Sequence, residues 1–224
     1  MSTIASKSAF PVLHSGDHLT FDEFVERAAN TKEFSHAELI QGIVFVTPAQ
    51  RYRFHGQPLS IVTALLTVYM LDTPGTEFGT QTTVKLDDRN GPEPDLFLRL
   101  MPIRQGLCDV NDKDYLAGPP ELVVEVAASS VSFDLYEKKD MYEEAGVLEY
   151  LVWRTEDEQI DCFRLVEGRY QKVVVENGVW ESTTFPGLRL DLNALLRYEL
   201  QLARKTLQEG MNSEVYLQFQ KVIS

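Results

Sequence analysis

The sequence predicts a mixed α/β fold in which a layer of strands packs against helices. In some segments apolar residues recur at every third or fourth position, as in helices, and in others they alternate or form short runs, as in strands. The predicted order is helix, strand pair, helix, several strands, helix, more strands and helix. Because this order is not a regular alternation of strand and helix, we expect a layered fold of mixed type. With 224 residues, 44% of them hydrophobic, the chain is long enough for one domain with a substantial core.

The overall charge limits the classes of partner. The formal net charge is −13 and the isoelectric point is about 4.7. Nonspecific binding to nucleic acid depends on Lys and Arg contacts to phosphate, so a protein that coats polyanions is disfavoured, although a local basic groove is compatible with this charge. Two cysteines, Cys108 and Cys162, are too few for a disulfide framework, and their spacing resembles no zinc site. This indicates a reducing compartment.

The sequence also predicts a cytoplasmic protein. The N-terminal segment lacks a charged start followed by an apolar stretch, so we expect no signal peptide. No uninterrupted run of about 18 apolar residues occurs, so we expect no membrane span.

In the first half of the chain, caps and periodicity predict two helices and several strands. Thr20 and Glu23 have the spacing of a capping box, which predicts a helix that ends near Asn30. A second helix is expected at residues 58–71, and strands are expected at 36–46 (a pair around a Gln-Gly turn), 78–86 and 94–98. Residues 47–56 are expected to form a basic loop, and residues 101–119 an irregular connection with at most a short helix.

The second half is organised around residues 120–153. An apolar run ends on Glu125, a serine-containing hinge follows, an amphipathic helix then carries Lys138, and a second apolar run ends the stretch. Downstream, Asp191 or Asn193 is expected to cap a C-terminal helix. Antiparallel strands are expected at residues 159–165, 170–175 and 178–181. We divide the chain into an N-terminal extension (1–19), a main domain (20–196) and a C-terminal helical extension (197–224).

Two carboxylates beside predicted strands are candidates for a metal site. Asp95 lies at the start of one apolar strand and Glu125 at the end of another. A buried strand has no reason to carry an unpaired charge, and two close carboxylates cannot both stay ionised without a cation. We therefore expect Mg²⁺ or Mn²⁺ here, with the backbone carbonyl of Val126 as a third protein ligand. The alternative is that both acids lie at strand ends and face solvent.

Lys138 is a candidate for the basic group of the same site. Helical spacing places it on one face with Leu135 and Tyr142, so inward packing of those two residues would direct the amine toward the sheet edge. There it would orient an attacking water or stabilise charge on a phosphate. The alternative is an exposed lysine that pairs with Asp134 or Glu137.

Further candidates come from the N-terminal half. Glu38 could supply a third carboxylate, or it is a surface acid. His55 forms a small cationic group with Arg51 and Arg53 that could hold a phosphate, or it belongs to a solvated loop. No serine lies in a G-x-S-x-G setting, no histidine pattern accompanies Cys108, and no glycine-rich phosphate loop occurs. These features disfavour serine hydrolases, cysteine enzymes and NTPases.

The candidate residues occur within motifs that resemble those of the Uma-two family of restriction-endonuclease-like proteins. The similarity extends over roughly residues 20–195, and the combination of motifs is more specific than any one of them. The matching segments are Glu38-Leu39-Ile40-x-Gly42, the Pro48 loop with His55, Pro94-Asp95, Pro120-Glu121-Leu122-Val123-Val124-Glu125-Val126, Asp134-Leu135-x-Glu137-Lys138 and Tyr142-Glu143-x-Ala145-Gly146-Val147-x-Glu149-Tyr150.

The resemblance implies the PD-(D/E)xK nuclease fold, a mixed central sheet flanked by helices. It implies that Asp95 and Glu125 are the motif acids and that Glu38 is an additional upstream acid. Ala127 stands where the motif lysine is usual, two places after the glutamate, and Lys138 is implied to take its place. The two motif acids are present, whereas the serine-containing hinge between Glu125 and Lys138 differs from the family pattern and affects where the lysine lies. The departures from the family pattern are Ala128-Ser129-Ser130 for Ser-Pro-Ser, Gln41-Gly42 for Asp-Gly, and Glu93 for Gln.

We therefore predict a Mg²⁺- or Mn²⁺-dependent nuclease, with DNA as the expected substrate. Asp95 and Glu125 would hold the metal, Lys138 would steer the nucleophile, and His55 or Arg53 would contact phosphate. One alternative is a non-catalytic, dimeric interaction module that keeps the nuclease fold, which the net charge favours. Another is a metal-dependent hydrolase of a small phosphate ester. Apolar strand edges and the leucine-bearing C-terminal helix predict a homodimer.

Overall fold

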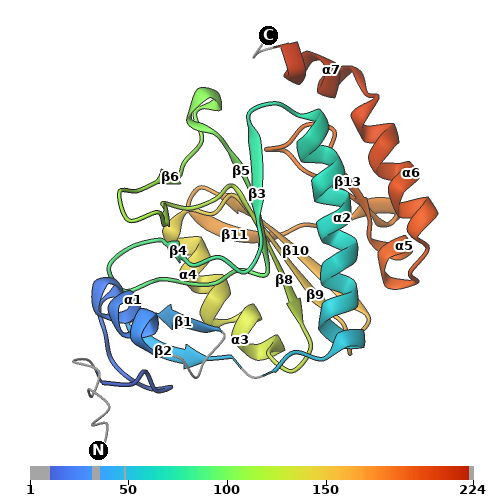
Figure 1. Cartoon of the computed structure of the whole chain (residues 1–224). Helices are drawn as coiled ribbons and strands as arrows, with labels where there is room; N and C mark the ends of the chain where they lie inside the picture. The colour runs from blue at the N-terminus through green and yellow to red at the C-terminus, as the bar shows by residue number, and fades with distance from the viewer. Residues whose placement is uncertain (1–10, 32–35, 48, 222–224) are drawn as a thin grey trace, which may run out of the picture.

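A computed structural model of the chain describes residues 11–31, 36–47 and 49–221 (Figure 1). The strands of its central sheet are β3 (Thr76–Gly79), β5 (Leu96–Leu100), β8 (Leu122–Ala127), β9 (Glu149–Arg154), β10 (Gln159–Val166) and β11 (Arg169–Lys172). Their order in space is β11-β10-β9-β8-β5-β3. Neighbouring strands run antiparallel except β8 and β9, which are parallel, so the sheet is mixed.

Helices lie on both faces of this sheet, which gives the domain three layers (Figure 1). The α-helices are α1 (Phe21–Asn30), α2 (Gln57–Asp72), α3 (Val131–Leu135), α4 (Glu137–Ala145), α5 (Leu192–Leu196), α6 (Leu200–Met211) and α7 (Glu214–Lys221). Helices α2, α5, α6 and α7 contribute to the core on one face, whereas α3 and α4 cover the other. This arrangement confirms the predicted α/β class.

Strand β8 determines which side chains face which layer. All of its residues are buried, as expected of a strand covered on both faces. Leu122 and Val124 belong to the core beneath α2, whereas Ala127 belongs to the core beneath α4. Because successive side chains of a strand point to opposite faces, Glu125 lies on the same face as Ala127. The acid is therefore directed into the layer of α3 and α4.

Helix α2 packs into the larger core through residues that include Val62, Leu66 and Tyr69. Together with the turn before it, the stretch Tyr52–Asp72 is 21 residues long and contains a largely apolar window of 18 residues. By length and composition alone it is the one helix, within the described part of the chain, that is apolar enough to cross a membrane. Core helices of globular domains meet the same criterion, and we interpret α2 as one because its buried side packs against the sheet.

The N-terminal unit consists of α1 and a hairpin of β1 (Ala37–Ile40) and β2 (Ile43–Val46). Thr20 and Glu23 form the predicted capping box at the start of α1. The predicted Gln-Gly turn joins the two strands of the hairpin. Backbone hydrogen bonds in both directions between Leu39 and the segment before β5 attach the hairpin to the central sheet.

The region between β3 and β8 differs from the prediction. The single strand expected at residues 78–86 is instead two strands, β3 and β4 (Val84–Lys85), which belong to different sheets. The connection expected to be irregular contains the short strands β6 (Asp109–Val110) and β7 (Leu116–Ala117), which join β4 in a small sheet. It also contains the 3-10 turn η2 (Pro102–Arg104). Strands of two residues have no alternating pattern, so periodicity cannot reveal them.

Two helices that were expected to be continuous are interrupted. The helix that carries Lys138 breaks at Tyr136, whose φ and ψ of −121° and −78° separate α3 from α4. The C-terminal helix is three helices, and Tyr198, with a φ of 56°, lies between α5 and α6. Asp191 is the cap of α5, because its carboxylate accepts a hydrogen bond from the Ala194 backbone N–H at 2.8 Å. Asn193 lies inside that helix.

Two further expectations were wrong. The strand β12 (Val179–Glu181) does not extend the β10–β11 pair, but pairs with β13 (Arg189–Asp191), which was not predicted. The basic loop expected at residues 47–56 ends in one turn of π-helix, η1 (Tyr52–Gly56), which runs directly into α2. Pro48, which belongs to a motif of the resemblance, lies outside the described residues.

The helices beyond residue 196 pack on the same core as α2, to which they contribute Ala203, Leu207, Met211 and Tyr216. The division of the chain into a main domain and two extensions stays a prediction. Residues 1–10 of the expected N-terminal extension lie outside the described part of the chain.

Candidate active site

The register between β5 and β8 brings Asp95 and Glu125 together. These strands are antiparallel, and Leu96 pairs with Val124, so the residue before Leu96 lies beside the residue after Val124. The Asp95 backbone N–H donates a hydrogen bond to Glu125 Oε2 at 3.2 Å. The Val126 backbone N–H donates to Asp95 Oδ2 at 2.8 Å. Glu125 is 3% exposed and the Asp95 side chain 14%, so the acids do not face open solvent.

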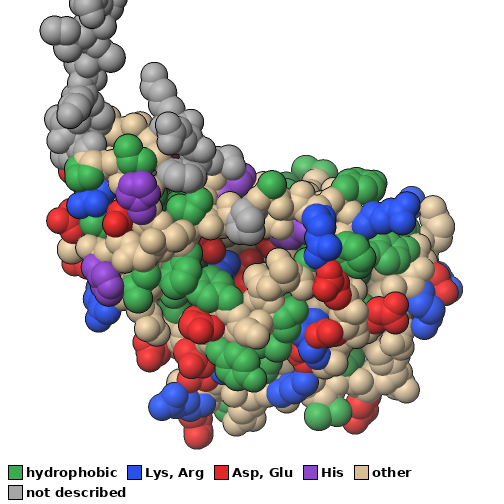
Figure 2. Space-filling model, turned by 90° about the horizontal axis from the view of Figure 1, so that it is seen from below, with side chains coloured by type: hydrophobic (Ala, Val, Ile, Leu, Met, Phe, Trp, Pro, Cys, Tyr) green, Lys and Arg blue, Asp and Glu red, His purple; other side chains and the backbone are tan. Residues whose placement is uncertain are grey.

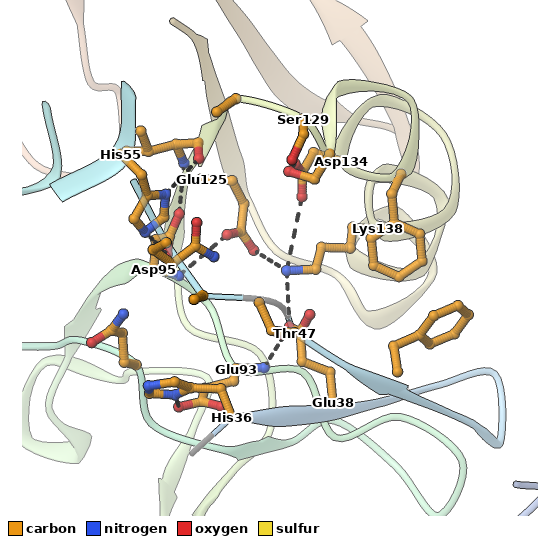
Figure 3. Close-up of a pocket in the computed structure, with 18 of the residues that line it drawn as sticks. His36, Glu38, Thr47, His55, Glu93, Asp95, Glu125, Ser129, Asp134 and Lys138 are labelled. Carbon is orange, nitrogen blue, oxygen red and sulfur yellow. Dashed lines mark hydrogen bonds and ion pairs between the residues drawn. The ribbon is translucent and has the colours of Figure 1, made fainter. Parts of the chain in front are cut away.

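The Lys138 amine lies among carboxylates in the same site (Figure 3). Its Nζ is 2.8 Å from Glu38 Oε1, 3.0 Å from Glu125 Oε1 and 3.8 Å from Asp134 Oδ1. Both Lys138 and Glu38 are buried. The alternatives of an exposed lysine and a surface glutamate are therefore wrong.

Glu38 reaches the site from the β1–β2 hairpin rather than from the central sheet. Its Oε1 also accepts a hydrogen bond from the Glu93 backbone N–H at 2.8 Å. The Glu93 side chain pairs with His36, whose Nδ1 lies 2.8 Å from Glu93 Oε1. The N-terminal unit is thereby tied to the segment that leads into Asp95.

His55 is buried beside Asp95 and does not belong to a solvated loop. The π-turn carries one extra residue, because the Gly56 N–H donates to the carbonyl of Arg51, five positions earlier. His55 Nδ1 lies 2.9 Å from the Val126 carbonyl oxygen, to which it donates a hydrogen bond. His55 Nε2 lies 3.2 Å from Asp95 Oδ1, but it makes no aligned hydrogen bond with any described residue.

Two residues of the site were not predicted as such. Tyr142 was interpreted as a core residue, but its buried hydroxyl donates a hydrogen bond to Glu125 Oε1 at 3.0 Å. Asp134 was considered only as a surface partner of Lys138, yet it is 3% exposed and accepts a hydrogen bond from the Ser130 hydroxyl at 2.5 Å. Its spacing of four residues from Lys138 was a usable signal, because such pairs meet on a helix. Tyr142 belongs to a motif of the resemblance, but its helical spacing alone does not distinguish it from a core tyrosine.

Burial and charge shift the pKa values of the site groups. Burial raises the pKa of Glu125 well above its usual value, although the Lys138 ammonium opposes this shift. Burial likewise raises the pKa of Asp134, to about 6. Burial disfavours the charged form of Lys138, but Glu125 and the other carboxylates reverse this effect and raise the pKa of the amine. Burial also acts to lower the pKa of His55, but Asp95 more than offsets it, so that pKa is raised.

The site opens to solvent through a pocket of about 310 Å³. Figure 2 shows it from below as a recess in which acidic, basic and histidine side chains are visible. Buried side chains, among them Glu125 and Lys138, form its floor, and exposed residues such as Gln50 and Ser129 form its rim. The charged groups therefore lie in a depression and not on an open surface.

The donor atoms in this pocket fit a divalent cation. Asp95 and Glu125 offer carboxylate oxygens and Val126 offers a carbonyl oxygen. His55 adds the buried imidazole nitrogen Nε2, which lies 3.2 Å from Asp95 Oδ1 without an aligned hydrogen bond. Among residues 11–31, 36–47 and 49–221, no three His, Cys, Asp or Glu side chains form a preassembled metal site. A cation would thus use few protein side chains and complete its coordination with carbonyl, water or substrate oxygens, as Mg²⁺ commonly does.

The two arginines expected to cluster with His55 are exposed, whereas His55 is buried. Arg51 lines the pocket mouth, where its guanidinium lies 2.6 Å from Glu156 and 4.9 Å from the centre of the Phe54 ring. Arg53 is exposed and pairs with no acid in the part of the chain that the structure describes. The cationic group is therefore divided between one buried imidazole and two surface guanidinium groups.

The mixed central sheet with helices on both faces agrees with the fold that the resemblance implied. The profile of the Uma2 family, described as "Putative restriction endonuclease", matches residues 21–193. The chain belongs to this family, which confirms the resemblance to the Uma-two proteins.

The fold is also similar to a solved structure, that of a putative nuclease belonging to DUF820 from Anabaena variabilis ATCC 29413. The TM-score is 0.61 and the sequence identity 12%, and the match covers 80% of this chain and 98% of that chain. At this identity, the likeness shows the fold alone. No curated protein matches the sequence.

Proposed function

We propose that this protein is a Mg²⁺- or Mn²⁺-dependent nuclease that hydrolyses phosphodiester bonds of nucleic acid, with DNA as the expected substrate. The observation that carries the proposal is the convergence of Asp95, which precedes β5, Glu125 of β8 and Lys138 of α4 in one open pocket (Figure 3). Buried ion clusters are costly to fold, and perturbed pKa values gather at functional sites. Membership of a family described as putative restriction endonucleases supports the same class of reaction.

In this proposal Asp95, Glu125 and the Val126 carbonyl hold the cation. When bound, the cation would lower the pKa of a water molecule and polarise the phosphate. Tyr142 and Lys138 fix Glu125 by hydrogen bonds to Oε1, while Oε2 turns toward the backbone of Asp95. The Lys138 amine supplies positive charge and hydrogen bonds to the nucleophile or to the phosphate oxygens.

The burial of His55 favours a different role from the phosphate contact expected for it. Its imidazole is enclosed between Val126 and Asp95, away from the surface. We propose that His55 positions Asp95 through the 3.2 Å contact of its Nε2 with Asp95 Oδ1, and that the neutral imidazole offers this nitrogen to the cation when the ion binds. A nitrogen ligand suits Mn²⁺ better than Mg²⁺, which prefers oxygen. Arg53 is then the candidate for contact with phosphate.

Replacement of Asp95 by Asn tests the proposal, because Asn keeps the shape of the side chain and removes its charge. We expect the parent to cleave plasmid DNA with Mn²⁺, and Asp95→Asn to be slower by about 100-fold or more, since metal activation contributes several kcal/mol. Asp88→Asn, at a carboxylate that is 86% exposed, is the control and should cleave normally. Equal cleavage by Asp95→Asn and the parent would reject the assignment.

A non-catalytic interaction module is the second candidate, and the engagement of the carboxylates favours it. Glu125 Oε1 already accepts hydrogen bonds from Lys138 and Tyr142, and Asp95 Oδ2 from a backbone N–H. The net charge of −13 also opposes contact with nucleic acid. Calorimetric titration with Mn²⁺ separates the two candidates. A nuclease should bind the ion and lose binding in Asp95→Asn, whereas an interaction module should show no specific heat.

We also propose that the protein forms a homodimer through its C-terminal helices. Their exposed apolar residues are Leu200, Leu202, Val215 and Leu217. Light scattering at micromolar concentration should give twice the chain mass of 25.5 kDa, and the mass of a single chain would contradict the dimer. The cytoplasmic location stays a prediction.

A further inference from the structure

Residues 51–54 directly precede the buried His55, and Arg51 lines the pocket. The proposed reaction gives no role to the two aromatic side chains of this segment. Tyr52 is 72% exposed and Phe54 38%. Arg53 is exposed and unpaired among the described residues. We call this segment the rim segment. Figure 2 shows hydrophobic side chains and Lys or Arg side chains side by side next to the recess.

The rim segment is fixed to the site on two sides. It forms the π-turn whose inward residue, His55, contacts Asp95. On its other side, the Thr155 hydroxyl donates a hydrogen bond to the Phe54 carbonyl at 2.7 Å, and Arg51 pairs with Glu156. The exposed rings are therefore held at a defined place relative to the acids. Single π-turns within helical segments occur frequently at functional sites.

We propose that the rim segment binds an unpaired strand of nucleic acid whose scissile phosphate enters the pocket. Tyr52 provides the ring on which a base stacks, and Arg53 contacts the phosphate next to that base. Aromatic rings select unpaired strands because the face of a base is free to stack on protein only when it leaves the duplex. The inference rests on the proposed nuclease function, since it names the class of substrate for the same site.

The depth of the site also favours an unpaired strand. Glu125 and Lys138 are 3% and 5% exposed and lie on the floor of the pocket. A duplex carries its phosphates on a stiff outer surface, whereas a single strand bends and can lower one phosphate into a recess. Among the described residues, the Lys and Arg side chains that line the pocket are Arg51 and Lys138, and both already pair with carboxylates. Little positive charge is thus left for the two backbones of a duplex.

Fluorescence anisotropy with a labelled DNA oligonucleotide, single-stranded or annealed to its complement, tests the inference. EDTA in the buffer prevents metal-dependent cleavage, so binding is measured alone. We expect the single strand to bind at least tenfold more tightly than the duplex. Tyr52→Ala should weaken single-strand binding by about fivefold or more, whereas Tyr52→Phe, which keeps the stacking ring, should bind like the parent.

The salt dependence of binding tests the role of Arg53. Arg53→Gln should reduce the slope of log K against log salt concentration by about 0.7, the value for one phosphate contact to a single strand. Arg204→Gln, at an exposed arginine on α6, is the control. It also removes one positive charge, but at a position distant in sequence from the rim segment, and should leave the slope unchanged.

The possible results separate this inference from the nuclease proposal. Duplex binding as tight as single-strand binding, unchanged binding in Tyr52→Ala, or no binding of either DNA would overturn the inference. If cleavage with Mn²⁺ still depends on Asp95, the nuclease proposal survives that result. Conversely, single-strand binding that depends on Tyr52, without any cleavage by the parent, would keep the inference and reject the nuclease. Thermal melting shows whether Tyr52→Ala is folded.

Discussion

At the residue scale, the site gathers more negative charge than the protein itself balances. One ammonium group, that of Lys138, is surrounded by carboxylates that belong to Glu38, Glu125 and Asp134, with Asp95 next to them. Burial raises the pKa of Glu125 and of Asp134, so protons partly replace the missing positive charge. A divalent cation would take over the same task, which is why the cluster suits a metal-dependent reaction.

Asp134 gives this charge balance a measurable pH dependence. Its pKa is about 6 in the folded protein, against 3.8 for the unperturbed group. Between these values the folded state holds a proton that the unfolded state has lost, so this group makes the free energy of unfolding fall as the pH rises from 4 to 6. Asparagine does not titrate. The stability of Asp134→Asn relative to the parent should therefore increase from pH 4 to pH 7, by up to about 3 kcal/mol.

Urea denaturation at several pH values, without divalent cations, measures this difference. The parent and Asp134→Asn are compared in the same buffers, and Asp140→Asn, at a carboxylate that is 61% exposed, serves as the control. A stability difference for Asp134→Asn that stays constant or shrinks as the pH rises would show that Asp134 ionises normally in the folded protein.

The residues of the site were predictable to different degrees. Asp95, Glu125 and Lys138 could be proposed because a charge beside an apolar strand, or on the inward face of a helix, departs from the usual pattern. Tyr142 follows that pattern as a buried apolar ring, and only its hydroxyl contact with Glu125 reveals its part in the site. The direction of the His55 side chain depends on a π-turn, for which the sequence offers no local signal.

At the scale of elements, the site depends on where β5, β8 and α4 begin and end. The pairing of Leu96 with Val124 aligns the two strand acids, and the break at Tyr136 sets the start of the helix that carries Lys138. Apolar periodicity predicted these elements because each buries one or both faces. It did not predict the break at Tyr136, nor that β12 pairs in a second sheet instead of extending the central one, because both features depend on contacts between distant segments.

The position of the site lysine can be tested by moving the lysine from α4 to β8. Ala127 lies two residues after Glu125 on the same face of β8, where related motifs carry a lysine. We expect Lys138→Ala to lose Mn²⁺-dependent cleavage. The double variant Ala127→Lys/Lys138→Ala should recover part of that activity, because the new amine starts from the strand beside the same carboxylate.

A plasmid cleavage assay measures the recovery, and Lys139→Ala is the matched control. Lys139 is the neighbouring helix lysine and pairs with Asp140 at 3.0 Å, outside the site, so its loss should leave cleavage nearly unchanged. A double variant that is folded and binds Mn²⁺ but stays inactive would show that an amine from β8 does not reach the reacting groups.

At the scale of the whole molecule, the C-terminal helices complete the core on the face opposite the site. Tyr216 of α7 packs against Tyr69 of α2, with ring centres 5.9 Å apart. Helix α6 approaches the chain so closely that a Cβ atom on Gly210 would lie 2.3 Å from the carbonyl oxygen of Gly187. The central sheet is therefore held between two helical layers, and the site residues Asp134 and Lys138 belong to α3 and α4 of one of them.

The close approach at Gly210 predicts a large effect of a small substitution. Gly210→Ala should lower the free energy of unfolding by about 2 kcal/mol or more, because backbone must move to admit the methyl group. Gln208→Ala, at an exposed position of the same helix, should change it by less than about 0.5 kcal/mol. Thermal melting compares the two. Equal stability of Gly210→Ala and the parent would show that α6 does not pack as closely as described.

The nuclease proposal requires that Asp95, Glu125 and the Val126 carbonyl share one divalent cation. Diffraction from crystals soaked in Mn²⁺, recorded where manganese scatters anomalously, tests it most directly. We expect one strong anomalous peak in the pocket, in contact with both carboxylates and the carbonyl, that is absent from Asp95→Asn crystals. A pocket without such a peak, in parent crystals that bind Mn²⁺ only at surface acids, would contradict it.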